Sequence, residues 1–491
     1  MPRLTLFRRS TGAGPVLRIL AILLLVLAVI MLMPLVLLLI EGNSDARAFV
    51  YSEAVTLGCA GLVLLVTNGL DLELRPRQMF ILTTMSWVVL SAFASLPMIF
   101  GAPHLSLSDA VFESVSAITT TGSTVLVGID NLSDGIKLWR GLMQWVGGIG
   151  IIVMAIAILP FLQVGGMRLF QTESSDWSDK VLPRAGGIAK AIGVVYLGLS
   201  VAAMLSYWLA GMRPFDAIVH AMSSMSTGGF ANYDASFGVY ADKPLILWLA
   251  VFYMLCGGLP FVLFVRLVRE RSGAIWRDQQ VRGLLVLLVV TTVLLAGYRF
   301  IRGVPLGEAL TQAAFNIVSV VTTTGYASDD YTLWGPLAVG IFFYLTFVGG
   351  CSGSTSGGMK VFRFQIGIIM LVNQLRHLVH SNGVFAQRYN GRMLTDEVIR
   401  GVIAFSFFFF ITVAVLALGL SLMGLDLITS LSGAATAVAN VGPGLGDTIG
   451  PAGNFAALPD AAKWMLCIGM LMGRLEILTV LVLLTPTFWR K

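Results

Sequence analysis

Four short glycine-centred stretches decide the fold of this chain. They read Thr-Thr-Thr-Gly at 119–122, Ser-Thr-Gly-Gly at 226–229, Thr-Thr-Thr-Gly at 322–325 and Asn-Val-Gly-Pro at 440–443. Each follows a short amphipathic run that is too brief to span a bilayer. Aligned on Gly122, Gly228, Gly325 and Gly442, they lie 106, 97 and 117 residues apart. A unit of about one hundred residues therefore recurs four times, and four copies in one chain can surround one axis.

The composition of the chain indicates that this axis crosses a membrane. Of the 491 residues, 57% are hydrophobic and only 12% are charged, and the mean hydropathy is +0.86. A soluble core does not need so much apolar surface, so we predict one all-α integral membrane protein. Ten spans are expected, near 19–40, 50–70, 79–100, 137–163, 187–210, 244–266, 282–300, 336–350 continuing past 359, 398–423 and 462–486.

Basic residues predict the orientation of these spans. The first apolar run follows Arg3, Arg8, Arg9 and Arg18, is too long for a signal peptide and lacks a cleavage site. It is therefore expected to be a retained helix, with the N-terminus in the cytoplasm. Three later basic clusters fall on the same side, at Arg168, Lys180, Arg184 and Lys190, at Arg266, Arg269, Arg271, Arg277 and Arg282, and at Arg363, Arg376, Arg388, Arg392 and Arg400. The net charge of +6 is thus a topology signal and does not indicate nucleic-acid binding.

Each repeat is predicted to be a helix, a half-helix, a glycine segment and a second helix. The half-helices begin near Asp109, Asp216, Glu308 and Asp426, whose charge complements the helix dipole. Non-helical backbone at membrane depth must be buried in protein or line a wet cavity. Four half-helix C-terminal ends, each with partial negative charge, would stabilise a cation on the common axis.

The residues of the glycine segments favour a large monovalent cation. Thr and Gly offer backbone carbonyls without bulky side chains, and a ring of carbonyls selects K⁺ in known filters. No carboxylate lies within the segments, which argues against a divalent cation. The opposite membrane face is acidic, with Asp130, Asp134, Asp234, Asp329, Asp330 and Asp447 beside Lys137 and Arg140. These residues are either solvated loops or a mouth that attracts cations.

These residues resemble the four filter loops of the Trk/Ktr/HKT superfamily of K⁺ transporters, and the two extra N-terminal helices are most similar to the bacterial Trk-type membrane subunit. The resemblance implies four repeats around one K⁺-channel-like pore, in the bacterial inner membrane. It assigns K⁺ coordination to the backbone of Thr120, Thr121, Gly122, Ser226, Thr227, Gly228, Thr323, Thr324, Gly325, Asn440, Val441 and Gly442. The fourth segment departs from the Thr-Thr-Gly form but is similar to the family's fourth loop.

The resemblance also implies a domain division and partners. We expect a two-helix extension at 1–75 and pore repeats at 76–170, 171–275, 276–392 and 393–491. Subunits of this type form homodimers and sit on cytosolic RCK-type regulatory proteins that bind nucleotides. The basic loops at 266–282 and 363–400 suit such a partner or anionic membrane lipid equally well. K⁺ is then the transported ion, and no organic cofactor is expected in this chain.

A glycine- and serine-rich run, Val348–Met359, interrupts the second helix of repeat three. It lacks the Gly-Lys-Ser/Thr of a phosphate loop, and no strand precedes it, so nucleotide binding is excluded there. It is either a packing seam of small residues or a loop that faces the pore. The resemblance favours a movable gate that includes Gly350, Gly353, Gly357 and Gly358.

Charged residues flank this expected gate. Arg474 lies in the last span, where an intramembrane charge indicates a partner or a cavity. It resembles the pore-facing Arg of the family, which contacts the gate loop and limits ion flow. Glu476 is too close in sequence to pair with it on one helix. Lys360 could add a second positive barrier, although snorkelling to the cytoplasmic interface is the more usual role.

Other chemistry is sparse. His104, His220, His377 and His380 form no metal-ligand motif, and the four cysteines lie singly in or near apolar spans. No constellation of catalytic residues can be traced, so the chain is not expected to be an enzyme. The predicted function is gated K⁺ uptake, with or without a coupled H⁺ or Na⁺. The alternative is a secondary transporter of a small solute with a midplane site at broken helices.

Overall fold

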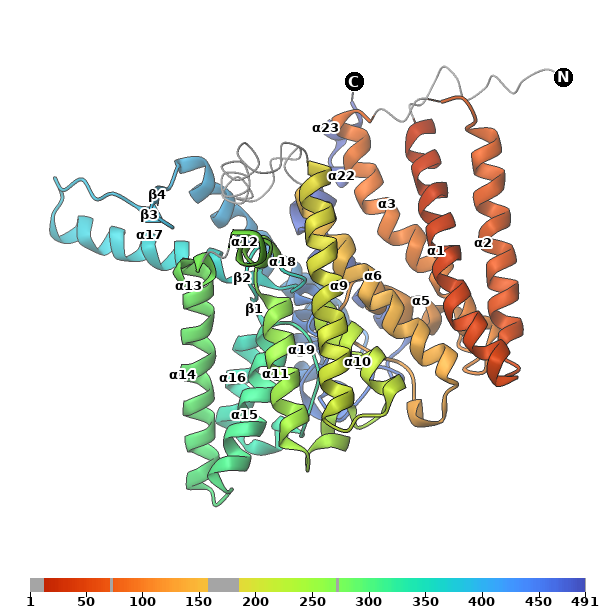
Figure 1. Ribbon diagram of the computed structural model, residues 1–491. Coiled ribbons are helices and arrows are strands. Elements are labelled where there is room, and N and C mark those ends of the chain that lie inside the picture. The colour runs from red at the N-terminus through yellow and green to blue at the C-terminus, as the bar shows by residue number, and fades with distance from the viewer. Residues whose placement is uncertain (1–12, 71–73, 158–184, 271–272, 491) are drawn as a thin grey trace.

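The computed structural model describes residues 13–70, 74–157, 185–270 and 273–490 (Figure 1). These residues are almost entirely helical. The strands among them are two pairs of two residues each, the parallel pair β1 (Val348–Gly349) and β2 (Met359–Lys360) and the antiparallel pair β3 (Arg388–Tyr389) and β4 (Arg392–Met393). Arg3, Arg8, Arg9, Arg168, Lys180, Arg184 and Arg271, which carry part of the predicted orientation, lie outside the described residues.

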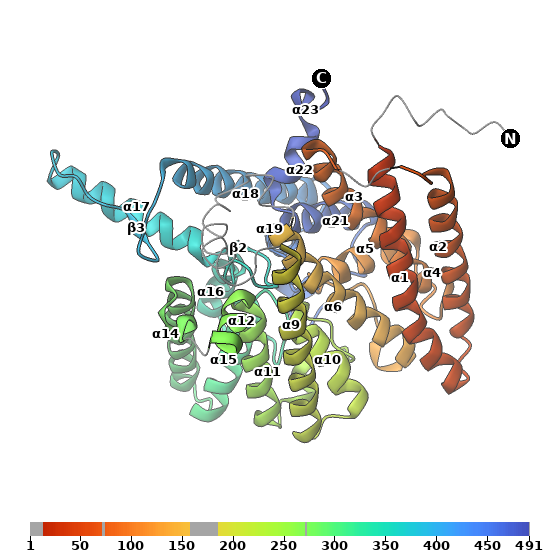
Figure 2. The same cartoon turned by 45° about the horizontal axis from the view of Figure 1, so that its top comes forward.

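Two helices precede the repeats, as predicted. They are α1 (Gly14–Glu41) and α2 (Ala46–Val66), which lie antiparallel at one side of the molecule (Figures 1 and 2). Gly42 ends α1 in the left-handed conformation that glycine adopts without strain. Both helices are long and apolar enough to cross a membrane.

Each of the four repeats has the predicted order of helices. The first helices are α3 (Pro76–Ala94), which continues into α4 (Leu96–Phe100), α9 (Ala185–Leu209), α14 (Gln279–Ile301) and α18 (Asp396–Leu422). The half-helices, called pore helices below, are α5 (Leu107–Ile118), α10 (Pro214–Ser226), α15 (Leu306–Val321) and α19 (Leu427–Ala439). The second helices are α6 (Asp134–Ala157), α11 (Pro244–Gly258), α16 (Pro336–Thr346) and α21 (Asp460–Arg474).

The remaining helices are extensions and connections. Extensions of the second helices are α12 (Phe261–Glu270), α17 (Val361–Val379) and α22 (Ile477–Leu484). Short connecting helices are η2 (Ile129–Asn131), η3 (Ser236–Tyr240), α13 (Ala274–Arg277), η4 (Tyr331–Trp334), α20 (Gly446–Ile449) and α23 (Pro486–Trp489). Helix α17 projects sideways from the bundle together with β3 and β4 (Figures 1 and 2).

The continuous spans predicted at 244–266 and 462–486 are corrected by the structure. Helices α11 and α12 meet at an angle of 96°, and α21 and α22 meet at 112°. At the first bend Pro260 lies between the helices and cannot donate a helical hydrogen bond. At the second bend Glu476 has a φ of 61°, which interrupts the helix. Six helices of the described chain pass a length and hydropathy test for membrane crossing, or eight if each bent pair is one span.

The pore helices begin where acidic residues were predicted to start them. Ser106 caps α5 by accepting a hydrogen bond from the amide of Asp109, and Asp426 caps α19 through the amide of Thr429. Asp216 and Glu308 lie in the first turns of α10 and α15. Negative groups at these positions stabilise the helix N-termini.

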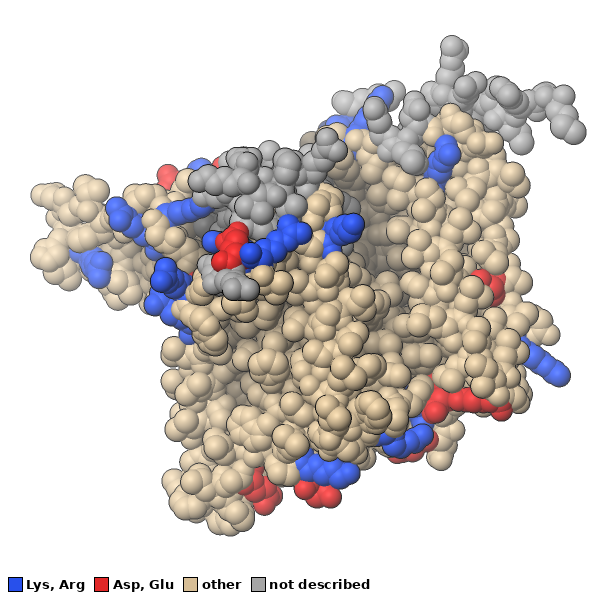
Figure 3. Space-filling model, viewed as in Figure 1, with Lys and Arg blue, Asp and Glu red and all other residues tan. Residues whose placement is uncertain are grey.

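Charge separates into layers along the axis of the helices. On the face shown in Figure 3, Lys, Arg, Asp and Glu gather at the two ends, and a broad belt between them carries few charges. Exposed apolar residues such as Val289, Val293 and Phe407 belong to spanning helices, where contact with lipid satisfies them. The start of α1 and the end of α23 lie at the same end of the molecule (Figure 1).

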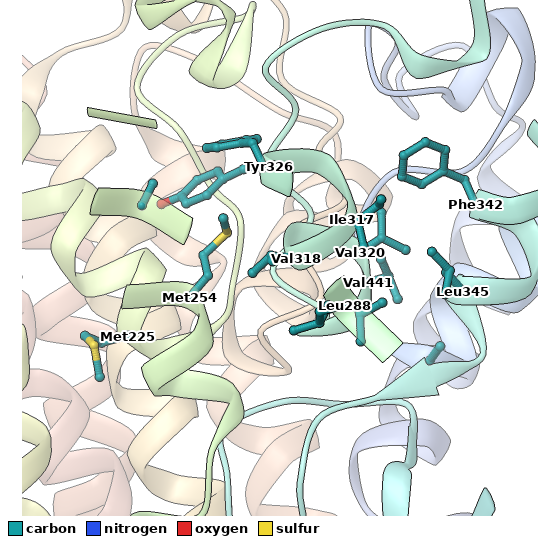
Figure 4. Packing of buried hydrophobic residues seen from close by; sticks show 14 of the residues in the cluster. Met225, Met254, Leu288, Ile317, Val318, Val320, Tyr326, Phe342, Leu345 and Val441 are labelled. Atoms are coloured by element: carbon teal, nitrogen blue, oxygen red, sulfur yellow. The ribbon is translucent and has the colours of Figure 1, made fainter. Parts of the chain in front are cut away.

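The hydrophobic core surrounds the pore helices. In Figure 4, Ile317, Val318 and Val320 of α15 lie among Met254 of α11 and Leu345 of α16. All five are buried. Because this packing holds α15 on several sides, the loop at its C-terminal end has a fixed position.

Candidate functional site

The four glycine segments fold into loops with the same backbone conformation. In each loop a residue with a left-handed φ is followed two positions later by a glycine with positive φ. The left-handed residues are Thr120, Thr227, Thr323 and Asn440, with φ of 53°, 49°, 57° and 54°. The glycines are Gly122, Gly229, Gly325 and Gly442, with φ of 89°, 80°, 85° and 114°. The three residues from the left-handed residue to this glycine are called the filter triplet below.

This geometry corrects the register predicted for repeat two by one residue. The central amide of each triplet donates to a carbonyl five residues earlier, Thr121 to Ser116, Gly228 to Ser223, Thr324 to Ser319 and Val441 to Thr436, at 2.8 to 3.1 Å. The alignment on Gly228 was therefore wrong, and Gly229 is the equivalent of Gly122. Ser226 lies one position before its triplet. Two adjacent glycines in the sequence allowed either alignment, and only the backbone geometry distinguishes them.

The four triplets close into a ring. A β-carbon on the glycine of one triplet would overlap the central carbonyl oxygen of the next triplet. The pairs are Gly122 with Gly228, Gly229 with Thr324, Gly325 with Val441, and Gly442 with Thr121. The last contact returns to repeat one, so the loops surround one axis without a gap. Glycine is required at these positions both by its positive φ and by the close approach of the neighbouring backbone.

Asn440 explains the different sequence of the fourth triplet. Asparagine tolerates the left-handed conformation better than most residues do. Its Nδ2 donates to Thr121 Oγ1 and to the carbonyl oxygen of Met470, both at 2.9 Å. The side chain thus joins the fourth triplet to the first and to helix α21.

Side chains of three pore helices brace the chain that leaves the ring. Glu113, His220 and Asn316 lie at equivalent positions, eight residues before the central residue of each triplet. Each accepts a hydrogen bond from the amide twelve residues later, that of Val125 at 2.9 Å, Asn232 at 3.4 Å and Ser328 at 3.2 Å. In repeat four, Ser432 Oγ accepts the corresponding hydrogen bond from the amide of Leu445, at 2.9 Å. These contacts were not predicted from the sequence, although the common spacing of Glu113, His220 and Asn316 is visible there.

Arg140, which the sequence analysis placed beside the outer acids, forms a buried ion pair. Its Nε lies 2.9 Å from Glu113 Oε1, and the side chains of both residues are at most 2% exposed. Nη1 donates to the carbonyl oxygen of Ala231 at 3.1 Å, and the guanidinium lies 4.0 Å from the ring centre of Phe230. Arg140 therefore joins repeat one to repeat two beside the filter.

A recess opens above the ring, and of the predicted outer acids Asp234 is one of its lining residues. The Asp234 carboxylate accepts from the amide of Ile129 at 3.1 Å. Asp329 instead lies 3.6 Å from Arg299, in an ion pair away from this lining. Asp234 therefore borders the recess, whereas Asp329 stabilises a loop through its ion pair.

The run Val348–Met359 forms a loop against the inner ends of the pore helices. Ser356 Oγ donates to the carbonyl oxygen of Thr322 at 2.5 Å, and the amide of Gly357 donates to Thr323 Oγ1 at 2.6 Å. Thr355 Oγ1 donates to the carbonyl oxygen of Met225 at 3.1 Å. The loop therefore contacts the end of α10 and the first residues after α15, directly beneath the ring.

The ends of this loop are held in place. Val348 pairs with Met359 and Gly349 with Lys360 in the parallel strands β1 and β2, which close the loop at its base. The amide of Phe261 donates to the carbonyl oxygen of Gly353 at 3.0 Å, so the loop also anchors the start of α12. β-carbons on Gly350 and Gly358 would lie 2.7 and 3.0 Å from backbone atoms of Gly258 and Gly349. The small residues thus allow close packing within a loop that also faces the filter.

Arg474 is the last residue of α21 and reaches the loop. Its Nη1 donates to the carbonyl oxygen of Thr355 at 2.8 Å, and the residue is 3% exposed. Nε and Nη2 have no hydrogen-bond partner among the described residues. Glu476 pairs instead with Arg363 at 2.7 Å, so the two charges near the bend are separated, as the sequence predicted.

Snorkelling would extend the Lys360 side chain to the cytoplasmic membrane interface, but the structure shows a different conformation. Its Nζ donates to the carbonyl oxygen of Ser356 within the loop. The side chain is folded back because this carbonyl offers a partner close to the lysine. Two cationic groups, Arg474 and Lys360, therefore contact the loop beneath the ring.

This architecture, with four tandem repeats around a ring of backbone carbonyls, defines a class of integral membrane transport protein. Residues 47–491 match the family model of the TrkH cation transport proteins. The chain is 66% identical over 478 residues to the Trk system potassium uptake protein TrkI of Halomonas elongata, with 97% of each chain covered. It is 37% identical to TrkH of Salmonella typhimurium, with 96% of this chain and 99% of the relative covered.

A solved structure is also similar to this chain in its fold. The crystal structure of the potassium transporter TrkH from Vibrio parahaemolyticus matches with a TM-score of 0.89 and 35% identity, covering 98% of this chain and 100% of that chain. The chain therefore belongs to the TrkH family, and this family assignment does not favour the alternative of a solute carrier.

Proposed function

We propose that this protein takes up K⁺ across the cytoplasmic membrane through the ring formed by the four filter triplets. The observation that carries the proposal is the closed series of glycine-to-carbonyl contacts from Gly122 through Gly442 and back to Thr121. Carbonyl rings replace the hydration shell of K⁺ in known filters. The names of the relatives as potassium uptake proteins support the same ion.

The coordinating groups are the backbone carbonyls of the four triplets, with Gly229 included in place of Ser226. The pore helices α5, α10, α15 and α19 end at the ring, so their negative dipole ends favour a cation beneath it. The charge is supplied by backbone dipoles rather than by carboxylates, which suits a monovalent ion that must also leave.

The loop Val348–Met359 acts as the gate, and Arg474 and Lys360 hold it closed. Arg474 is positively charged, bonded to Thr355 and only partly satisfied by described partners, so it opposes a cation on this path. To open, the loop must move away from the ends of α10 and α15. This movement breaks the small number of hydrogen bonds that the loop makes there. Such a barrier suits control by a regulatory subunit.

The N-terminus lies in the cytoplasm, and the regulatory partners bind on that side. Arg266 and Arg269 belong to α12 and Arg282 to the first turn of α14, and the positive-inside rule favours the cytoplasmic side for these basic residues. The protein acts as a homodimer under cytosolic RCK-type nucleotide-binding subunits. Size-exclusion chromatography with light scattering tests the dimer, and binding of a purified regulatory ring to protein in nanodiscs tests the second contact.

Uptake of radioactive Rb⁺ into liposomes tests the transport function. Vesicles that contain the purified protein are loaded with K⁺, Na⁺ or Li⁺, and protein-free vesicles are the control. We expect uptake into K⁺-loaded vesicles that external K⁺ blocks more strongly than external Na⁺. Absence of monovalent-cation uptake in the wild type and in an Arg474→Ala variant would overturn the proposal.

A further inference from the structure

Gln144 makes an unusual set of contacts beside the filter. It belongs to α6 of repeat one and is fully buried against the loop of repeat two. Its Nε2 donates to the carbonyl oxygen of Gly228 at 2.5 Å. Its Oε1 accepts from Ser223 Oγ at 2.7 Å and from the amide of Phe230 at 3.1 Å. One carboxamide therefore connects a pore helix, the central carbonyl of a filter triplet and the chain that leaves it.

Gln144 occupies the space of a side chain that repeat two lacks. The central residues of the other triplets are Thr121, Thr324 and Val441, whereas repeat two has Gly228. A β-carbon on Gly228 would lie 2.5 Å from Gln144 Oε1 and 2.8 Å from Nε2. Gly228 does not have a positive φ, so its backbone does not require glycine. The absence of a side chain there is what makes room for the carboxamide.

The second helices of repeats one and two pack in a similar way against the loops of the following repeats. Gly148 of α6 packs against Ser226, and Gly258 of α11 packs against Thr322, each the residue just before a triplet. Four residues before these glycines lie Gln144 and Met254. At the positions that Met254 and Thr324 occupy in the next repeats, the chain thus has Gln144, a hydrogen-bond donor on the helix, and Gly228, which has no side chain in the triplet.

We propose that Gln144 is a positioning residue that sets cation specificity by fixing the carbonyl of Gly228 in the ring. The proposal rests on the proposed K⁺ filter. Gly228 and Gly229 are adjacent glycines, so this part of the ring has the most conformational freedom. The bond from Nε2 holds the carbonyl at the distance that suits K⁺. Without it, the carbonyl can move to coordinate a smaller ion such as Na⁺.

The test is the ratio of K⁺ to Na⁺ competition against radioactive Rb⁺ uptake in liposomes. For Gln144→Leu the ratio falls about three- to tenfold, the size expected for one lost buried hydrogen bond. Gln365→Leu is the matched control. Its Nε2 donates to the carbonyl oxygen of Gln279 at 2.8 Å and its Oε1 accepts from Tyr389 at 2.6 Å, on α17 away from the ring. This control keeps the wild-type ratio.

A rescue separates positioning from general stability. Gln144→Met combined with Gly228→Thr gives these two positions the residue types of Met254 and Thr324. Threonine restricts the backbone more than glycine does, so the ratio returns to within about twofold of wild type although the donor is lost. Gly228→Thr alone does not, because threonine collides with the carboxamide. Where the Leu variant does not fold, Gln144→Met takes its place, since it has a similar length and no hydrogen-bond donor.

Each result bears on one proposal. An unchanged ratio in a folded Gln144 variant that lacks the donor overturns the role of Gln144. A wild-type protein that shows no preference for K⁺ over Na⁺ overturns the proposed filter instead. The two failures are therefore distinguishable in the same experiment.

Discussion

Arg474 Nη1 donates a hydrogen bond of 2.8 Å to the carbonyl oxygen of Thr355, and this bond joins the last repeat to the loop beneath the filter. The guanidinium is buried, and two of its nitrogens have no partner among the described residues. A buried cation that is incompletely paired is costly. Its presence at this position is explained if it opposes cations until the loop moves.

Replacement of Arg474 by Ala is expected to raise basal ion flux. Removal of the charge and of the bond to Thr355 lowers the barrier, and a change of about 1.4 kcal/mol corresponds to a tenfold increase. Radioactive Rb⁺ uptake into liposomes measures it. The control is Arg302→Ala, because Arg302 also donates to a carbonyl oxygen, that of Trp334, at 3.0 Å but away from the loop. Equal or lower flux in folded Arg474→Ala would contradict the gate assignment.

Replacement of Ser356 by Ala tests the loop itself. Ser356 Oγ donates to the carbonyl oxygen of Thr322 at 2.5 Å and accepts from the amide of Gly350 at 3.0 Å. Loss of about 1 kcal/mol from the closed state raises basal flux about fivefold. Ser354→Ala is the control, because Ser354 Oγ donates to the carbonyl oxygen of Cys351 within the same loop, at 2.6 Å. If both variants change flux equally, the contact with α15 does not hold the gate.

Replacement of Gly122 by Ser is expected to reduce the preference for K⁺ over Na⁺. The new β-carbon would overlap the carbonyl oxygen of Gly228, and the φ of 89° adds strain for a residue other than glycine. The ring must widen or tilt, so we expect the ratio of K⁺ to Na⁺ uptake to fall by about tenfold. Gly58→Ser on the exposed side of α2 is the control, because a β-carbon there meets no atom within 4 Å. An unaltered ratio would remove Gly122 from the filter.

Replacement of Arg140 by Met is expected to lower thermal stability. The single change leaves Glu113 buried and unpaired, which costs about 3 to 5 kcal/mol. The double variant, with Glu113→Gln added, recovers part of the loss because no charge remains buried. Unfolding in detergent, followed by intrinsic fluorescence, measures both. For comparison, Arg266→Met breaks the exposed pair with Glu270, 3.3 Å apart, and changes stability by at most about 1 kcal/mol.

Much of the fold could be predicted from local patterns. The runs before Gly122, Gly325 and Gly442 are too short to span a bilayer and have an acidic residue at or near their start, and the structure has pore helices there. Non-helical backbone in a membrane must be satisfied, so repeated glycine segments predict a shared axis. Arg474 was identifiable because an intramembrane charge is expensive.

Details that depend on contacts between repeats could not be predicted. Gly228 and Gly229 are equally plausible in the sequence, and only their hydrogen bonds show which one matches Gly122. Gln144 and Glu113 look like ordinary polar residues of helices until their partners are known. The 112° bend at Glu476 has no proline to signal it, and the ion pair with Arg363 is 113 positions distant.

The sequence by itself determined that the chain is a membrane protein with four repeats, because hydropathy, helix caps and glycine positions are local and additive properties. Only the tertiary structure decided the register of the ring, the partners of Arg140, Gln144 and Arg474, and the bends at Pro260 and Glu476. These features depend on contacts between repeats that lie about one hundred residues apart in the sequence. The contacts form only when the four loops close on one axis.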